Sequence, residues 1–196
     1  DGVGCLEKDN LKLKVIGPKW QSCTTFGTSF GFLEGDQYKS VERVIHEMIE
    51  VVSRNGNFLI NIGPKADGTL VPEQVKRLRA MGDWLKINGD AIYGTRYWKV
   101  SAQEDEHLAF TTKGKTLYAI KLAKPSAAFI VEAAAGWKAE DVKSVRLLGS
   151  DAEVGWSIKP DGLHIMPSSN LGESQFAWSF KIVTNADQHQ PNAIIA

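Results

Sequence analysis

Two polar side chains stand where a short apolar run ends and a turn-rich loop begins. Asn61 interrupts the apolar run 58–62, and Asp67 lies in the loop that follows it. In a parallel sheet or barrel, functional groups lie on the loops at the carboxyl ends of the strands, so both residues are candidates for a site. Strand and turn formation is the simpler interpretation of the two residues, because Asp67 and Gly68 form a tight-turn pair. The four histidines have no metal-ligand spacing, so no metal site is expected.

Two periodic segments flank this run and predict helices. Apolar residues recur at helical spacing over 41–52, with Ser40 as the N-cap and the pair Asn55 and Gly56 as the stop. A second helix has Pro72 in its first turn and ends at Asn88. The order helix, strand, helix predicts the closing units of an α/β architecture.

The segments before the first of these helices are less regular. The run KLKVI at 12–16 is expected to be a short strand, closed by a glycine and a proline. The segment KWQSCTTFGTSFGF at 19–32 is rich in Ser, Thr, Gly and aromatic residues, which is typical of a functional loop.

The pattern changes after Trp98 to short alternating segments. A hairpin is expected around Lys113 and Gly114. Further strands are expected at 128–132, 142–148, 154–158, 163–166 and 176–183, each bounded by Gly, Pro, Asp or Ser. This spacing favours an antiparallel β-sandwich, so the fold class is α/β plus all-β. We expect an α/β unit at 1–97, the sandwich at 98–184 and a tail at 185–196.

Composition excludes some partners. The 23 basic and 23 acidic residues cancel, so no net field favours nucleic acid or an acidic membrane surface. No apolar run approaches the roughly 20 residues of a membrane-spanning helix. Cys5 and Cys23 are compatible both with one disulfide and with two separate thiols.

Several strings resemble one enzyme family. NGNFLINIGPKADGTLVPEQ and GDWLKINGDAIYGTRYW are similar to the C-terminal part of the catalytic domain of the α-L-fucosidases of glycoside hydrolase family 29, and KWQSCTTFGTSFGF and FAWSFKIV also fit. The resemblance implies a (β/α)8-like barrel followed by a C-terminal β-sandwich. It also implies retaining hydrolysis of α-L-fucosides in fucosylated glycans, with no metal and no cofactor.

The resemblance further implies that part of the barrel is missing. A barrel of this type takes about 250 residues, and only residues 1–97 precede the expected sandwich. The expected partner is the N-terminal portion of the same barrel, in the same or a separate chain, and that portion holds the nucleophile. Residues 1–97 are not expected to be stable alone. Family members act on extracytoplasmic glycans, so a periplasmic or secreted location is expected.

The resemblance points to Glu7 as the general acid/base. Retaining glycosidases use two carboxyl groups roughly 5 Å apart, and the family's acid/base lies upstream of a motif that matches residues 29–32 here. A solvated loop glutamate beside Lys8 and Asp9 is the alternative. Many members carry a glutamate where this chain has Gln21, and an amide cannot transfer the proton. We favour Glu7, and sequence spacing does not decide between the two positions.

Two aromatic residues are candidates for the sugar pocket. Phe30 matches a family position that places an aromatic ring against the sugar, and Trp20 is a weaker candidate for the pocket wall. Core packing is the alternative for both. A second hypothesis is a non-catalytic, truncated carbohydrate-binding protein that uses Trp137, Trp156 and Trp178 of the sandwich as its platform, although tryptophans in alternating strands more often belong to the core.

Overall fold

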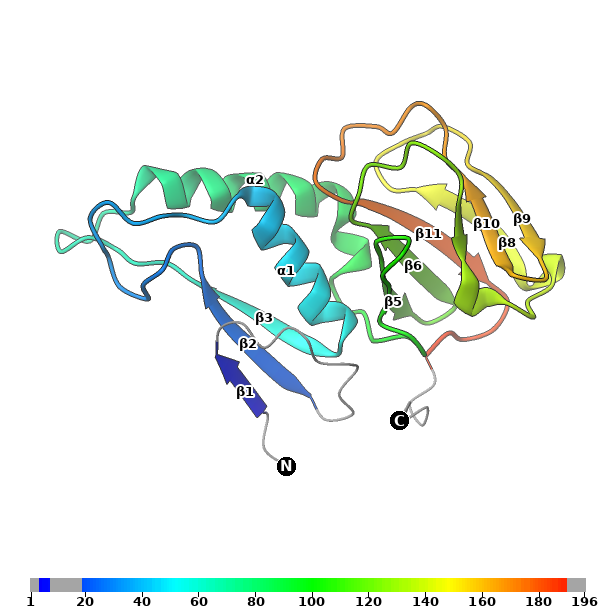
Figure 1. The fold of residues 1–196 in the computed structure, drawn as a ribbon, viewed down its shortest axis with the longest axis horizontal. Coiled ribbons are helices and arrows are strands. Elements are labelled where there is room, and N and C mark those ends of the chain that lie inside the picture. Colours follow the sequence, from blue (N-terminus) through cyan, green and yellow to red (C-terminus); the bar gives the residue numbers. More distant parts are fainter. Residues whose placement is uncertain (1–3, 8–18, 190–196) are drawn as a thin grey trace.

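The protein contains a small parallel sheet with two helices, joined to a larger antiparallel domain (Figure 1). The structure is a computed structural model, and it describes residues 4–7 and 19–189, with the side chains of 19–189. The strand expected at 12–16 lies outside the described residues. No helix within the described part of the chain combines the length and apolarity needed to cross a membrane.

The parallel sheet has the order β1-β2-β3, formed by β1 (Gly4–Glu7), β2 (Trp20–Thr25) and β3 (Gly56–Asn61). Helix α1 (Val41–Ser53) connects β2 to β3, and α2 (Pro72–Asn88) follows β3. Both predicted helices are confirmed. Ser40 caps α1 by accepting a hydrogen bond from the Arg43 backbone N–H at 3.1 Å.

The expectation of a loop at 19–32 is wrong for its first half, because Trp20–Thr25 is strand β2. The strand is unusually polar. Trp20, Ser22 and Thr24 are buried and alternate with partly exposed Gln21 and Cys23. Alternation between two faces predicts a strand even without apolar residues, but Ser and Thr are also typical loop residues, and this ambiguity misled the prediction.

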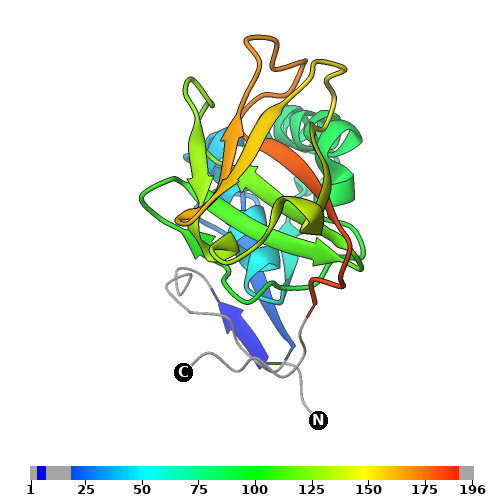
Figure 2. The same cartoon turned by 90° about the vertical axis from the view of Figure 1, so that its right-hand side faces the viewer.

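The antiparallel domain consists of two sheets (Figure 2). The first has five strands in the order β4-β5-β6-β11-β8, and the second has three in the order β7-β10-β9. The strands are β4 (Ala102–Gln103), β5 (Leu108–Lys113), β6 (Thr116–Lys121), β7 (Phe129–Val131), β8 (Val142–Leu147), β9 (Gly155–Lys159), β10 (Gly162–Met166) and β11 (Trp178–Thr184). The predicted hairpin is β5 and β6, and each of the other predicted strands is found within two residues. Short 3-10 helices occupy Gly89–Ala91, Glu132–Ala134 and Ala139–Asp141.

The five-stranded sheet is buried on both faces. Leu108, Phe110 and Leu117 belong to the core between the two sheets. Tyr118 and Ile120 of the same sheet belong to a second core that includes α1 and α2. The two parts of the chain therefore share one apolar interface.

Hydrogen bonds reinforce this interface. The Trp84 indole N–H donates to the Ala177 carbonyl at 3.0 Å, and the His46 ring Nε2 lies 2.8 Å from the Phe176 carbonyl. The fully buried Asn88 donates to the Ser174 hydroxyl at 2.9 Å. Such pairing removes the cost of burying polar groups, so the helices are fixed on the sheet.

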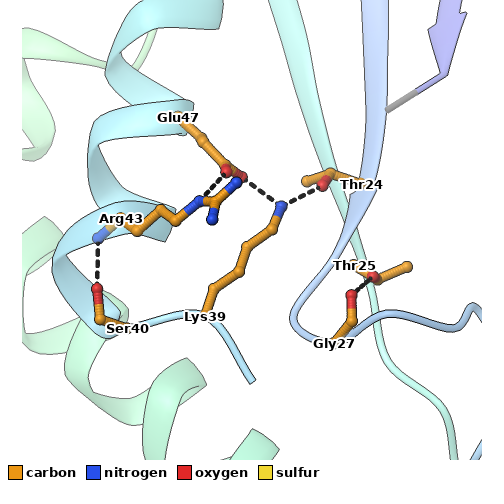
Figure 3. A network of polar contacts seen from close by, with 7 residues as sticks. All are labelled: Thr24, Thr25, Gly27, Lys39, Ser40, Arg43 and Glu47. Atoms are coloured by element: carbon orange, nitrogen blue, oxygen red, sulfur yellow. Dashed lines mark hydrogen bonds and ion pairs between the residues drawn. The ribbon is translucent and has the colours of Figure 1, made fainter. Parts of the chain in front are cut away.

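A polar network attaches α1 to the parallel sheet (Figure 3). The Lys39 ammonium lies 2.7 Å from the Glu47 carboxylate and donates to the Thr24 hydroxyl at 2.8 Å. Arg43 adds a second contact to Glu47 at 3.0 Å. Glu47 and Lys39 are both nearly buried, with side chains 11% and 14% exposed, so each needs the other to offset its lost hydration.

Replacing Glu47 with glutamine should therefore lower the free energy of unfolding by about 3 kcal/mol, because it leaves the Lys39 charge buried without its partner. Urea unfolding measures the change. The matched control is Glu42→Gln at an exposed position of the same helix, which should change stability by less than about 0.5 kcal/mol. Equal effects of the two substitutions would show that the network contributes nothing.

Candidate functional site

The carboxyl ends of the three parallel strands form one edge of the sheet. Strand register pairs Glu7 with Cys23, and Cys23 with Leu59, while Thr25 pairs with Asn61 at the end of β3. The loops after β2 and β3 project from this edge, at the end of the molecule opposite the antiparallel domain (Figure 1). Functional groups of parallel α/β folds gather at such an edge, so it is the candidate site.

Glu7 is the last residue of β1, so its backbone belongs to a strand end and not to a loop. Its side chain lies outside the described residues. Gln21 pairs with Cys5, two residues before the Glu7–Cys23 pair. At about 3.3 Å per residue, Glu7 is therefore about 6–7 Å closer to the carboxyl edge than Gln21. Cys23 is a free thiol, so it forms no disulfide.

Phe30 is carried on the loop between β2 and α1, which we call the Phe30 loop (residues 26–37). Phe30 is 43% exposed, so it is not a core residue in this structure. The loop is closed by Asp36, whose carboxylate accepts hydrogen bonds from the Thr28 backbone N–H at 3.0 Å and from the Thr28 hydroxyl at 2.6 Å. Gly27 leaves room for that carboxylate, which lies where a β-carbon would be.

These hydrogen bonds, chiefly those from Thr28, hold the pKa of Asp36 below its ordinary value. A lowered folded-state pKa means that the closure is fully present above the ordinary pKa of aspartate and is lost as the pH falls through the lowered value. We therefore expect the Thr28 amide to lose protection from hydrogen exchange only in acid. In Asp36→Ala it should exchange fast at every pH, and a wild-type amide that exchanges equally fast at neutral pH would contradict the closure.

Asn61 is the second point of attachment for the Phe30 loop. Its side-chain amide donates to the Phe30 carbonyl at 2.6 Å. Sequence reasoning placed Asn61 at the right edge without identifying this contact, and it missed Asp36 altogether. The only sequence signal for Asn61 was a single polar residue within an apolar strand.

Trp20 is the first residue of β2, whereas Phe30 lies on the loop that follows the last residue of this strand. It is only 3% exposed, and its indole N–H donates to the Arg54 carbonyl at 2.8 Å. Its ring fills the space beside Gly56, where a β-carbon would come within 2.6 Å of the ring. This environment favours core packing for Trp20 over a place in the pocket wall.

The remaining polar candidates have structural partners. Asp67 accepts hydrogen bonds from the Thr69 N–H at 2.9 Å and the Thr69 hydroxyl at 2.7 Å, and these bonds lower its pKa. This is turn chemistry. His164 is paired with Asp161 at 2.8 Å. Within the described residues, no group of three or more His, Cys, Asp or Glu side chains is arranged to hold a metal ion.

The sandwich tryptophans are part of the core or pack against it. Trp178 is a buried member of the core between the sheets, and the partly buried Trp137 and Trp156 pack against that core. Trp137 also makes an edge contact with Trp98, with ring centroids 6.1 Å apart. The three rings therefore do not form one exposed platform.

Among the residues that the structure describes, one face of β3 is exposed and one edge of this strand is unpaired. Leu59, in the middle of β3, is 47% exposed. Within the described residues, β3 pairs only with β2, so its other edge is open. A groove of about 500 Å³ lies between β3 and the helices. Apolar side chains of Met48, Val52, Phe58, Ile60, Met81, Leu85 and Ile92 line much of it.

Comparison with known proteins gives one family throughout. Residues 2–90 match the family model described as alpha-L-fucosidase, and residues 102–183 match the model described as alpha-L-fucosidase C-terminal domain. The chain is 33% identical over 174 residues to the tissue alpha-L-fucosidase of Bos taurus, covering 84% of this chain and 36% of that protein. It is 35% identical over 175 residues to the alpha-L-fucosidase of Branchiostoma floridae, covering 84% and 38%.

Solved structures agree. The Thermotoga maritima alpha-fucosidase in complex with fucose is similar with a TM-score of 0.75 and 31% identity, over 86% of this chain and 40% of that one. Alpha-L-fucosidase isoenzyme 1 from Paenibacillus thiaminolyticus gives a TM-score of 0.75 and 29% identity, over the same shares. The chain thus spans well under half the length of the relatives it matches.

Proposed function

Because this chain belongs to the α-L-fucosidases of glycoside hydrolase family 29, as a fragment that covers their C-terminal part, we propose that it works as part of a retaining enzyme that removes terminal α-L-fucose from glycans. The nucleophile lies in the N-terminal portion that the chain does not contain. The matched family models, which together cover most of the chain, carry this proposal.

Glu7 is the proposed general acid/base. It would protonate the leaving oxygen in the first step and activate water in the second, as retaining hydrolysis requires. This role of Glu7 is supported by its position in the parallel sheet. Glu7 ends a parallel strand at the candidate edge, whereas Gln21 lies farther from that edge, near the start of the central strand β2. Gln21 then has no part in proton transfer.

Phe30 is the proposed aromatic contact for the sugar. A fucose ring offers an apolar face and a methyl group, and both pack well against an aromatic ring. Phe30 meets the two conditions for this role, since it lies on the loop that follows the carboxyl end of β2 and it is exposed. Trp20 meets neither condition and is left out of the proposed pocket.

The proposed partner is the N-terminal portion of the same barrel, in the same or a separate chain. Residues 1–97 would complete a (β/α)8-like barrel with it, and residues 98–184 would remain outside as the sandwich. The exposed Leu59 and the open edge of β3 support this arrangement, because a further strand paired with β3 would cover both the edge and the apolar groove. A periplasmic or secreted location is part of the proposal.

The alternative, a non-catalytic carbohydrate-binding protein, needs an aromatic platform on the sandwich. The packing of Trp137, Trp156 and Trp178 against the core gives it little support.

Turnover of an aryl α-L-fucoside tests the proposal. Three preparations are compared: the 196-residue chain, the N-terminal portion of the same protein, and the two combined or in one polypeptide. Only the combined preparation should release nitrophenol. Intact mass and N-terminal sequencing of the native protein identify which form exists. A native protein that consists of the 196-residue chain alone and is inactive would overturn the enzyme proposal.

A further inference from the structure

The Phe30 loop is held at its base, and its tip receives two contacts, one from Asn61 at the end of β3 and one from Gly63 just beyond it. The base is closed by Asp36 and by a hydrogen bond from the Lys39 N–H to the Phe26 carbonyl at 2.8 Å. At the tip, Asn61 donates to the carbonyl of Phe30 itself at 2.6 Å. The peptide group is planar, so fixing this carbonyl also fixes the direction in which the chain leaves Phe30.

Gly63, two residues past the end of β3, makes the second contact. A β-carbon at Gly63 would lie 2.6 Å from the Gly31 carbonyl carbon and 2.8 Å from the Phe32 nitrogen. The two backbones therefore touch, and only glycine fits at position 63 without moving the loop. This contact lies one residue past Phe30, directly beside the hydrogen bond from Asn61.

An exposed side chain on a loop is ordinarily mobile, because few packing contacts restrain it. Phe30 is 43% exposed, yet its own carbonyl and the two residues after it are fixed by a strand that is 31 residues away in sequence. The arrangement also accounts for Asn61. Asparagine is unfavourable within a strand, and here its amide supplies the hydrogen bond that an apolar residue would lack.

We infer that Asn61, with Gly63 beside it, is a positioning residue that holds the Phe30 ring ready for the sugar. The inference rests on the proposed function, specifically on the contact between Phe30 and the sugar. A binding group that is already in place loses less entropy when the ligand arrives, so affinity rises without any new contact.

The test uses the full-length protein and the substitution Asn61→Asp. The change keeps the size of the side chain and replaces the donor amide with an acceptor that repels the Phe30 carbonyl. KM for an aryl α-L-fucoside should rise about tenfold, the equivalent of one lost hydrogen bond, with little change in kcat, because the ring contacts the sugar in the ground state and the transition state alike. The control is Asn170→Asp at an exposed position in a loop of the antiparallel domain, where the new carboxylate can still accept the hydrogen bond from the Gly172 N–H, and it should leave both constants unchanged.

Two further measurements complete the test. Hydrogen exchange of the Gly31 amide, which donates to the Ser29 hydroxyl at 3.2 Å, should become faster in Asn61→Asp and stay unchanged in Asn170→Asp. Gly63→Ala, which keeps the Asn61 amide, should raise KM in the same way by pushing Gly31 away.

These measurements separate a positioning role of Asn61 from a merely structural one. A fall in kcat and in melting temperature with KM unchanged would show a merely structural role and overturn the inference, as would unchanged KM and exchange in Asn61→Asp. If the wild-type protein has no fucosidase activity, the proposed function fails. The exchange measurement would then still show whether Asn61 holds the loop, but the role toward a sugar would fall with the function.

Discussion

Glu7→Gln in the full-length protein is expected to lower kcat for an unactivated α-L-fucoside by about 10²–10⁴-fold, the usual contribution of a general acid/base. Glutamine keeps the shape of the side chain but cannot donate or accept the proton in the reaction. The loss should be smaller for an aryl fucoside with a good leaving group, because its first step needs little protonation.

Azide separates this role from a general loss of structure. It is a strong nucleophile that needs no general base, so it should restore the second step in Glu7→Gln and yield fucosyl azide with retained configuration. Gln21→Ala should behave like the wild type. Wild-type turnover in Glu7→Gln would move the acid/base to another residue, and a large loss in Gln21→Ala would give that position a role that its place in β2 does not suggest.

Trp84→Ala is expected to lower the free energy of unfolding by about 3–5 kcal/mol. Trp84 is 3% exposed in the core between the helices and the five-stranded sheet, and its indole N–H donates to the Ala177 carbonyl at 3.0 Å. Truncation removes a large buried ring and one of the two side-chain donors to that carbonyl, which still accepts from the Ser174 hydroxyl at 2.7 Å.

Because the helices and the sandwich share this core, the two parts should unfold in one transition. Urea unfolding of the 196-residue chain, followed by far-UV circular dichroism and by tryptophan fluorescence, tests this. The control Tyr93→Ala removes an aromatic side chain that is 60% exposed and should cost less than about 1 kcal/mol. Two separate transitions, with only the first shifted by Trp84→Ala, would contradict a shared core.

An element could be predicted from the sequence when its apolar and polar residues lie clearly on two different faces. Helix α1 was predictable because its apolar residues recur at helical spacing after a serine N-cap. The hairpin of β5 and β6 was predictable from alternation around Lys113 and Gly114. Strand β2 was not, because its buried positions include the polar Ser22 and Thr24, and the Lys39 ammonium that pairs with the Thr24 hydroxyl comes from a different segment.

The site was less predictable, because its contacts join segments that are distant in sequence. The family resemblance selected Glu7 and Phe30, and the structure places both on elements of the carboxyl edge of the sheet. The link from Asn61 to Phe30 spans 31 residues, and no local pattern encodes it. Trp20 shows the reverse case: an aromatic residue near the motif in sequence lies at the far end of the strand in space.

The most direct test of the account is the stereochemistry of fucose release by the full-length protein, followed by proton NMR with an aryl α-L-fucoside as substrate. The account predicts that the first fucose released has the α configuration, with β-fucose appearing only as the two anomers interconvert, and that this release is slower in Glu7→Gln. Initial release of β-fucose, or no hydrolysis by a folded full-length protein, would contradict it.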